Sequence, residues 1–220
     1  MPFSTVENYL KAIWALQGHL NDDGLVPIGQ VAERLEVTPG TATTMMNQLT
    51  KQGLVEYVSR KGVRLNGNGR RAAMDVLRRH RLVETFLVEV MKFDWSEVHE
   101  EAEVLEHVIS DRLLQRIDEM LQHPTHDPHG APIPGPNGEM NQDGTLSLAE
   151  CESGQYVLRR VKGDDRSFLQ WLSDHNLRPG VRLSVCERNV AAGTVAIRVD
   201  QCEAALQVSL LSARSILVTG

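Results

Sequence analysis

Apolar and polar positions in the first part of the chain follow the period of amphipathic helices. Apolar residues recur three or four positions apart over residues 4–17, and Ser4 with Glu7 fits a capping box at the start of that helix. The segment 28–37 repeats the helical spacing over a shorter stretch. The pattern therefore predicts two helices that are joined by a polar loop.

A third helix and a hairpin follow directly. Thr38 is a good N-cap and Pro39 suits the first helical position, while Gly53 ends the helix. The segments 54–59 and 63–66 predict two short strands on either side of a basic turn. This order of elements predicts a winged helix-turn-helix. In this motif the helix that begins at Thr38 and Pro39 enters the major groove of DNA.

The middle of the chain predicts longer helices, and its last third predicts strands. Helical spacing extends over residues 68–90 and again over roughly residues 96–121. Five of the nine prolines fall within residues 123–143, which argues against a regular element there. Short alternating segments with one helix near residues 167–175 then predict a small β-barrel. We expect a mainly α-helical protein with a small β part. The expected domains are residues 1–72, 73–143 and 144–220.

Charge is divided unevenly along this architecture, although the 220 residues have a formal net charge of −6. Residues 1–81 carry 11 Lys and Arg against 7 Asp and Glu, whereas residues 82–130 carry 3 against 12. A cationic first part suits a polyanion such as DNA, and an acidic middle suits cations. The average charge therefore hides two different kinds of partner.

Several other classes of protein find little support in the sequence. No apolar run approaches the roughly 20 residues that span a bilayer, and the N-terminus lacks a basic stretch followed by an apolar one. We therefore expect a cytoplasmic protein without a membrane partner. Cys151, Cys186 and Cys202 have no CxxC spacing, which argues against a disulfide framework or a zinc ribbon.

The third predicted helix and the basic turn carry the candidate DNA-contacting groups. Short polar side chains can hydrogen-bond to base edges or phosphates, and cations attract phosphates whatever the base sequence. The candidates are Thr38, Pro39, Gly40, Thr41, Thr43, Thr44, Asn47, Arg60 and Lys61. The alternative is a solvated polar face on an ordinary helical domain.

Six of the eight histidines fall between residues 80 and 129. Four metal-binding side chains recur at helical spacing and would share one face of the predicted helix 96–121. They are His99, Glu103, Glu106 and His107. On the preceding helix His80 and Glu84 are again four residues apart, so a helical hairpin could bring both groups together. The alternative is an exposed acidic helix with fortuitous histidines.

Carboxylates and imidazoles without a nearby thiolate suit Mn²⁺ or Fe²⁺ better than copper, and Zn²⁺, Co²⁺ and Ni²⁺ should also bind in vitro. A metal-dependent enzyme is the alternative from another functional class. Di-iron helical bundles need Glu three residues before His, but those positions hold Leu77, Ser96 and Val104 here. Motifs of serine hydrolases, phosphate-binding loops and zinc proteases are also absent from the sequence.

With these features, the chain resembles the metal-dependent repressors of the diphtheria-toxin-repressor and manganese-transport-regulator family. The similar segments are ENYLKAIWAL, GTATTMMNQLTKQGLV, RRHRLVETFL, VHEEAEVLEHVISD and PHGAPIPG, in that order. The resemblance implies a winged helix, a helical metal-binding and dimerisation domain, and an SH3-like (FeoA-like) barrel. It also implies a dimeric, manganese-responsive repressor of metal-uptake genes that binds operator DNA. An iron(II)-dependent repressor of the same family is the alternative.

The resemblance implies a primary metal site with ligands from two parts of the chain. Glu103, Glu106 and His107 match the acidic segment, and Asn8 matches a first-helix position that usually holds Asp or Met. Glu103 stands where iron-type members have cysteine, so it favours manganese. Asp127, the residue before PHG, would add a ligand, as in the streptococcal manganese regulators.

The resemblance also implies an ancillary site at His80, Glu84 and His99, with Asp164 and Asp165 as the nearest candidate ligands from the barrel. The remaining clustered histidines, His123, His126 and His129, are interpreted as linker residues. Metal binding would tie the first helix to the dimer core and fix the spacing of the two recognition helices.

Overall fold

The computed structural model describes residues 3–18, 24–140, 144–163, 165–200 and 204–220. The chain divides into two compact units, each with its own buried apolar core. The first unit comprises residues 1–80, 104–110 and 134–139, and the second comprises residues 81–103, 111–133 and 140–220. In the part of the chain that the structure describes, no helix is long and apolar enough to cross a membrane.

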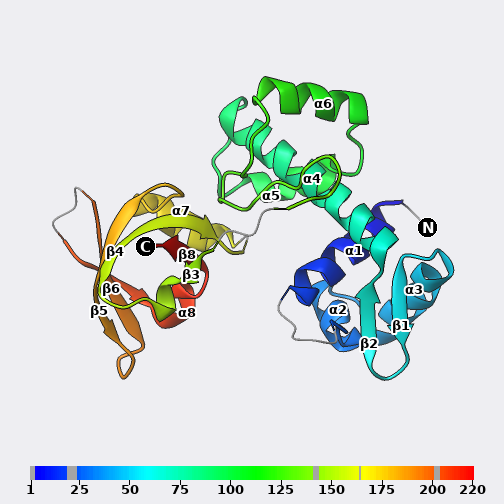
Figure 1. Cartoon of the computed structure of the whole chain (residues 1–220), viewed down its shortest axis with the longest axis horizontal. Coiled ribbons are helices and arrows are strands. Elements are labelled where there is room, and N and C mark those ends of the chain that lie inside the picture. Colours follow the sequence, from blue (N-terminus) through cyan, green and yellow to red (C-terminus); the bar gives the residue numbers. More distant parts are fainter. Residues whose placement is uncertain (1–2, 19–23, 141–143, 164, 201–203) are drawn as a thin grey trace. The chain divides into compact units, whose positions relative to one another are not determined.

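The first unit begins with three helices and a two-stranded hairpin, which confirms the predicted winged helix-turn-helix (Figure 1). Its elements are α1 (Phe3–Gln17), α2 (Ile28–Arg34), α3 (Pro39–Lys51), β1 (Val55–Val58) and β2 (Gly62–Leu65). Leu10, Ile13 and Met46 fill its core with at most 1% of their surface exposed. Thr38 caps α3, as predicted, by accepting a hydrogen bond from the backbone N–H of Thr41.

Helix α4 (Gly67–Glu89) follows the hairpin and confirms the long helix predicted there. The side-chain oxygen of Asn66 accepts hydrogen bonds from the backbone N–H groups of Asn68 and Gly69, so it satisfies two donors of the first turn. Gly69 packs against the hairpin so closely that a Cβ atom would lie 2.0 Å from the carbonyl oxygen of Leu54. Only glycine fits at this contact.

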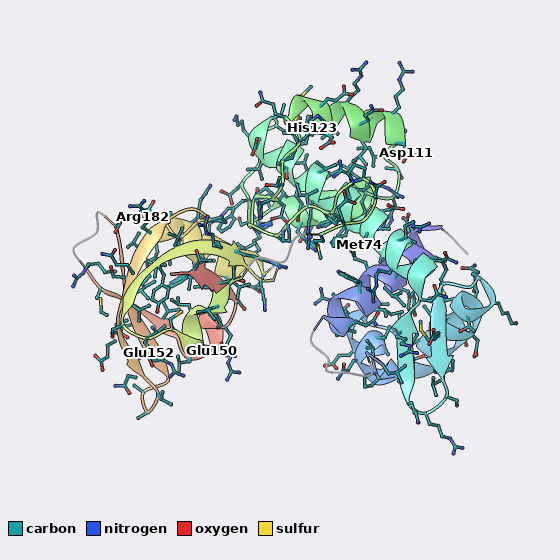
Figure 2. All side chains as sticks on the ribbon, in the orientation of Figure 1. Met74, Asp111, His123, Glu150, Glu152 and Arg182 are labelled. Carbon is teal, nitrogen blue, oxygen red and sulfur yellow. The ribbon has the colours of Figure 1, made fainter. Side chains whose placement is uncertain are left out.

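The single helix predicted over residues 96–121 is wrong, because two helices occupy this stretch. They are α5 (Val98–Leu105) and α6 (Asp111–Met120). Figure 2 shows Asp111 at the start of α6 and His123 beyond its end. Glu106 and His107 therefore lie in the turn after α5 and do not share a helical face with His99.

The break between α5 and α6 has a local cause. Val108 and Ile109 still donate backbone hydrogen bonds to the carbonyl of Leu105, but they are β-branched and poor helix formers. Ser110 and Asp111 follow, and such side chains favour the start of a helix over its interior. Apolar periodicity alone does not reveal this competition.

The C-terminal part of the second unit is a six-stranded antiparallel sheet with the order β3-β8-β4-β5-β6-β7. Its strands are β3 (Leu146–Ser147), β4 (Gly154–Val161), β5 (Arg182–Asn189), β6 (Thr194–Val199), β7 (Leu206–Ser209) and β8 (Ile216–Thr219). Its helices are the 3₁₀ turn η1 (Leu148–Glu150), α7 (Arg166–Asp174) and α8 (Leu210–Ala213). Leu158, Leu169 and Ile197 are fully buried in its core. The predicted barrel and its helix are confirmed.

The segment after α6 is irregular but not a loose linker. Among its described residues, strand-like pairing is limited to an isolated bridge between His126 and Pro132. Residues 129–133 are nevertheless buried. The backbone N–H of Val161 in β4 donates to the carbonyl of His129, and Gly130 lies against the backbone of Arg159. Residues 123–133 of the proline-rich segment are therefore a packed part of the second unit, whereas residues 134–139 belong to the first.

Candidate metal centres and DNA-contacting surface

Among the described residues of the first unit, Glu106 is the most buried carboxylate, with no exposed surface. Its Oε1 atom lies 2.8 Å from Lys11 Nζ, and its Oε2 atom accepts a hydrogen bond of 2.5 Å from His80 Nδ1. Burial alone would raise the pKa of Glu106, but the hydrogen bond from His80 and the charge of Lys11 outweigh it and hold the pKa below its usual value. The carboxylate is therefore a buried, ionised group.

His107 is held by the first helix. Its Nδ1 atom donates a 2.6 Å hydrogen bond to Oε2 of Glu7, and the other oxygen of Glu7 accepts a 2.9 Å hydrogen bond from Arg79. Because Nδ1 carries the proton, the neutral ring presents the lone pair of Nε2. That atom is buried, lies 3.5 Å from Oε1 of Glu106 and has no hydrogen-bond partner among the described residues.

Like His107, Asn8 has a buried polar atom without a hydrogen-bond partner within the described ranges; Asn8 is the first-helix ligand that the sequence predicts. Its Oδ1 is buried and likewise has no hydrogen-bond partner in the described part of the chain. Buried oxygen and nitrogen acceptors without partners are costly unless a ligand satisfies them. Glu106 and His107, whose Oε1 and Nε2 atoms lie 3.5 Å apart, thus fit a divalent cation that accepts oxygen and imidazole ligands, and Asn8 in the same unit offers a further oxygen.

A second group of metal-binding side chains lies within the second unit. Glu84, Asp127 and His129 are all buried, and one ligand atom from each lies within 4.8 Å of the others. His129 Nε2 donates a 2.9 Å hydrogen bond to the carbonyl of Trp95, which leaves the lone pair of the ring on Nδ1, 3.9 Å from Glu84. Three buried donors thus meet at one point.

Asp127 is fixed in this group by its own loop. Its Oδ1 atom accepts hydrogen bonds from the backbone N–H groups of His129 and Ala131, and Arg81 Nε lies 3.4 Å from its Oδ2 atom. Burial and the nearby Glu84 carboxylate raise the pKa of Asp127, against the opposing charge of Arg81. Asp127 also lines a cavity of about 400 Å³.

The structure groups several predicted ligands differently from the sequence. Asp127, predicted for the primary site, lies with Glu84 and with His129, for which the sequence suggested only a linker role. His80, predicted for the ancillary site, donates to Glu106. His99 Nδ1 lies 3.4 Å from Oε1 of Glu84, which the sequence predicts for the same site.

The other predicted ligands have different surroundings. Glu103 lies in the second unit, where its Oε1 atom is 3.6 Å from His99 Nε2. Asp165 is exposed and caps α7 by accepting a 2.7 Å hydrogen bond from the backbone N–H of Phe168. Asp164 lies outside the described residues.

Three residues around the two groups are not predicted by the sequence. Glu7 fits a capping box, yet only 3% of it is exposed and it holds His107. Lys11 and Arg81 place positive charge beside the buried carboxylates. One signal is available: Glu7 and Lys11 are four residues apart, so they share one face of α1.

The predicted DNA-contacting residues lie on the surface of α3 and the hairpin turn. All nine are exposed except Thr43, which is half-buried: Thr38, Pro39, Gly40, Thr41, Thr43, Thr44, Asn47, Arg60 and Lys61. Thr43 and Thr44 hydroxyls donate to carbonyls one turn earlier in α3. Arg60 adopts a left-handed backbone conformation (φ 64°) at the tip of the turn. Exposed polar groups on α3 and cationic groups on the turn between β1 and β2 suit a surface that contacts DNA.

Comparison with known families gives matches along most of the chain. The family described as "Iron dependent repressor, N-terminal DNA binding domain" matches residues 1–63. "Iron dependent repressor, metal binding and dimerisation domain" matches residues 66–135, and "FeoA domain" matches residues 146–219.

Individual proteins are similar over much of their length. The "Iron-dependent repressor IdeR" of Mycobacterium leprae is 32% identical over 195 residues, which cover 82% of this chain and 83% of that protein. The "Diphtheria toxin repressor" of Corynebacterium diphtheriae is 35% identical over 198 residues, covering 84% and 85%. A solved structure described as "Manganese-dependent transcriptional repressor complex with manganese" has a TM-score of 0.89 and 38% identity, covering 98% of this chain and 99% of that one.

Proposed function

Because the chain belongs to the family of metal-dependent transcriptional repressors that includes the diphtheria toxin repressor, we propose that Mn²⁺ is its corepressor and that metal-uptake genes are its targets. One observation carries the metal assignment: His107 Nε2 is buried without a hydrogen-bond partner among the described residues, beside the buried carboxylate of Glu106. Carboxylate and imidazole donors without a thiolate favour Mn²⁺ and Fe²⁺ over softer metals.

The first metal site that we propose uses Glu106, His107 and Asn8, with Glu103 as the further ligand that the sequence predicts. When bound, the metal supplies positive charge and directional bonds to these donors. Glu7 orients the imidazole of His107 by accepting its Nδ1 proton, which keeps the lone pair on Nε2. Glutamate at position 103, and the similarity to a structure whose title names manganese, support Mn²⁺ over Fe²⁺.

The second metal site that we propose uses Glu84, Asp127 and His129, with His99 beside Glu84. This grouping replaces the sequence-based proposal that Asp127 serves the first site. The hydrogen bond from His129 Nε2 to the Trp95 carbonyl fixes the ring and its tautomer, as the hydrogen-bond partners of metal-bound histidines generally do. The domain boundaries of residues 1–72, 73–143 and 144–220 also stay our proposal.

The link from metal to DNA that we propose passes through α1. This helix packs in the winged-helix core through Leu10 and Ile13, and it also holds His107 through Glu7. Ligands on both α1 and the turn after α5 would restrict the movement of the winged helix. In a dimer, that restriction would fix the spacing of two recognition helices in successive major grooves.

A metal titration tests the two proposed sites. We expect Mn²⁺ to bind the parent protein in two resolvable steps under calorimetry, His107→Ala to remove one step and His129→Ala to remove the other. His123→Ala is the matched control, because that side chain is exposed and lies outside both groups.

A separate comparison tests which metal is the corepressor. DNA binding is measured with Mn²⁺ and, under anaerobic conditions, with Fe²⁺. DNA binding that responds to Fe²⁺ but not to Mn²⁺ would overturn the manganese proposal.

A salt titration tests the DNA surface. Each phosphate contact that is lost lowers the slope of log affinity against log salt by about 1. We therefore expect Arg60→Ala and Lys61→Ala each to weaken binding to all duplexes and to flatten the slope by about that amount. Arg116→Ala is the control, since this exposed arginine lies on α6. Unchanged slopes for both hairpin variants would exclude the proposed contact.

A further inference from the structure

Lys11 is in contact with both oxygens of Glu106. Its Nζ atom lies 2.8 Å from Oε1 and 3.0 Å from Oε2, so the ammonium group is placed against the whole carboxylate. The side chain of Lys11 is 18% exposed, whereas Glu106 has no exposed surface. The positive charge therefore reaches the buried carboxylate from α1 while part of the lysine side chain stays at the surface.

The ammonium group of Lys11 occupies the lone pairs of the Glu106 carboxylate that a metal ion would need. A buried carboxylate is stable only when hydrogen bonds or an opposite charge compensate it, and Lys11 and His80 provide that compensation. A divalent cation bound to Glu106 would stand next to the ammonium group, and like charges at such short range repel strongly in a buried environment. The two cations compete for the same carboxylate.

We propose that Lys11 is the resident counter-ion of the metal-free first site and leaves Glu106 when metal binds, so that its charge sets the metal concentration at which the repressor responds. This inference rests on the metal site proposed above. Its consequence is a one-for-one exchange of cations: the metal-free protein keeps Glu106 compensated, and metal binding releases the lysine toward solvent. The lysine thereby raises the metal concentration that is needed for occupancy.

Arg81 in the second unit shows why this exchange belongs to the first site. Arg81 lies 3.4 Å from Asp127, but it also donates to the carbonyl of Pro132 and contacts the sulfur of Met140. Burial lowers the pKa of Arg81 to about 10. Arg81 is thus held by several segments, whereas the long, flexible stem of Lys11 lets its ammonium group move away from Glu106.

Lys11→Met tests the inference because it keeps the stem and removes the charge. We expect Mn²⁺ to bind the first site on the order of tenfold more tightly, which is within the usual range of coupling between sites. We also expect a lower melting temperature in chelator, since Glu106 loses its counter-ion, and hence a larger rise in melting temperature on adding Mn²⁺. Lys11→Arg keeps the positive charge and should show no such gain in Mn²⁺ affinity, and Lys51→Met is the control because Lys51 is exposed at the end of α3.

A second measurement uses the parent protein and needs no variant. Acetylation of lysine amines, followed by mass spectrometry, should label Lys11 faster after Mn²⁺ loading, while Lys61 on the exposed hairpin turn should show an unchanged rate. Equal or weaker Mn²⁺ binding by Lys11→Met, or slower labelling of Lys11 after loading, would overturn the inference. Glu106→Gln separates the two proposals: if it leaves Mn²⁺ binding intact, the proposed site itself is wrong.

Discussion

At the scale of single residues, each candidate centre combines buried carboxylates with a cation from another segment. Glu106 has Lys11, and Asp127 has Arg81. Unpaired buried charges would be far more costly than paired ones, which explains why the metal-free protein can fold around these acids. The stability of the carboxylates therefore depends on neighbours that the sequence does not place beside them.

Sequence spacing could identify part of this arrangement. Glu106 and His107 stand in an acidic stretch with histidines at regular spacing, whereas only the resemblance to manganese regulators implies Asp127 as a ligand. The role of Glu7 is hidden because a glutamate three residues after a serine also fits a capping box. Which carboxylate faces which histidine depends on tertiary packing, so Asp127 and His80 could not be assigned to their groups from spacing alone.

The first prediction concerns the charge of Glu106. Its pKa in the folded protein lies below the unfolded value of about 4.3, so ionised Glu106 contributes stability above that pH, and the contribution is lost as the pH falls through the folded pKa. Glu106→Gln should therefore lower the free energy of unfolding by about 1–3 kcal/mol near neutral pH in chelator. The deficit should shrink in acid.

Urea unfolding followed by circular dichroism between about pH 3 and pH 7, a range that brackets the carboxylate titration, checks this. Glu33→Gln is the control, because Glu33 is exposed on α2. A deficit for Glu106→Gln that stayed constant across this pH range would mean that the ionised carboxylate is not the source of stability.

At the scale of elements, capping residues and helix propensity set where the helices begin and end. Thr38 and Pro39 mark the start of α3, and the structure agrees. The continuous helix over residues 96–121 fails because apolar periodicity survives the turn that separates α5 from α6. A strand as short as the two residues of β3 carries too little alternation to be distinguished from a loop.

The second prediction compares two glycines in the first turn of α4. A Cβ atom on Gly69 would lie 2.0 Å from the carbonyl oxygen of Leu54, whereas one on Gly67 would meet nothing within 4 Å. Alanine is the better helix former at both positions by about 0.5–1 kcal/mol. We expect Gly69→Ala to lower the free energy of unfolding by roughly 2 kcal/mol or more through the clash, and Gly67→Ala to be neutral or stabilising.

Urea denaturation of both variants in chelator is the measurement. Equal stabilities for the two variants would show that the hairpin does not approach α4 as closely as the structure indicates.

At the scale of the whole molecule, the net charge of −6 has a structural meaning. The cationic winged helix suits DNA, and the acidic middle contains the carboxylates of both candidate centres. Family membership shows that the protein is a metal-dependent repressor, and repressors of this family bind operator DNA and dimerise. The three-domain architecture could be predicted because each part of the chain has its own helical or strand periodicity. Dimer contacts could not, because they depend on which exposed side chains face a second copy, and periodicity does not reveal that.

The third prediction concerns dimerisation. Val104 and Val108 are 66% and 74% exposed on either side of Glu106, within the region that matches the metal-binding and dimerisation domain. Isolated exposed valines are ordinary, but two of them beside the turn that holds Glu106 and His107 suit a protein interface. We expect Val108→Lys to weaken the dimer at least about tenfold, since a charge buried in an interface is costly.

Sedimentation equilibrium of the Mn²⁺-loaded protein measures the dimer constant. Leu211→Lys is the matched control, because Leu211 is 77% exposed on α8 and lies outside that region. An unchanged dimer constant for Val108→Lys would place the interface elsewhere.

The coupling of metal to DNA is the central claim, and one measurement tests it most directly. A duplex is first selected from random sequence by the Mn²⁺-loaded parent, and its affinity is then titrated with and without Mn²⁺ for the parent and for His107→Ala. We predict that Mn²⁺ tightens binding by the parent about 5–150-fold and has little effect on the variant. If metal-free His107→Ala bound this duplex as tightly as the loaded parent does, the account would be contradicted.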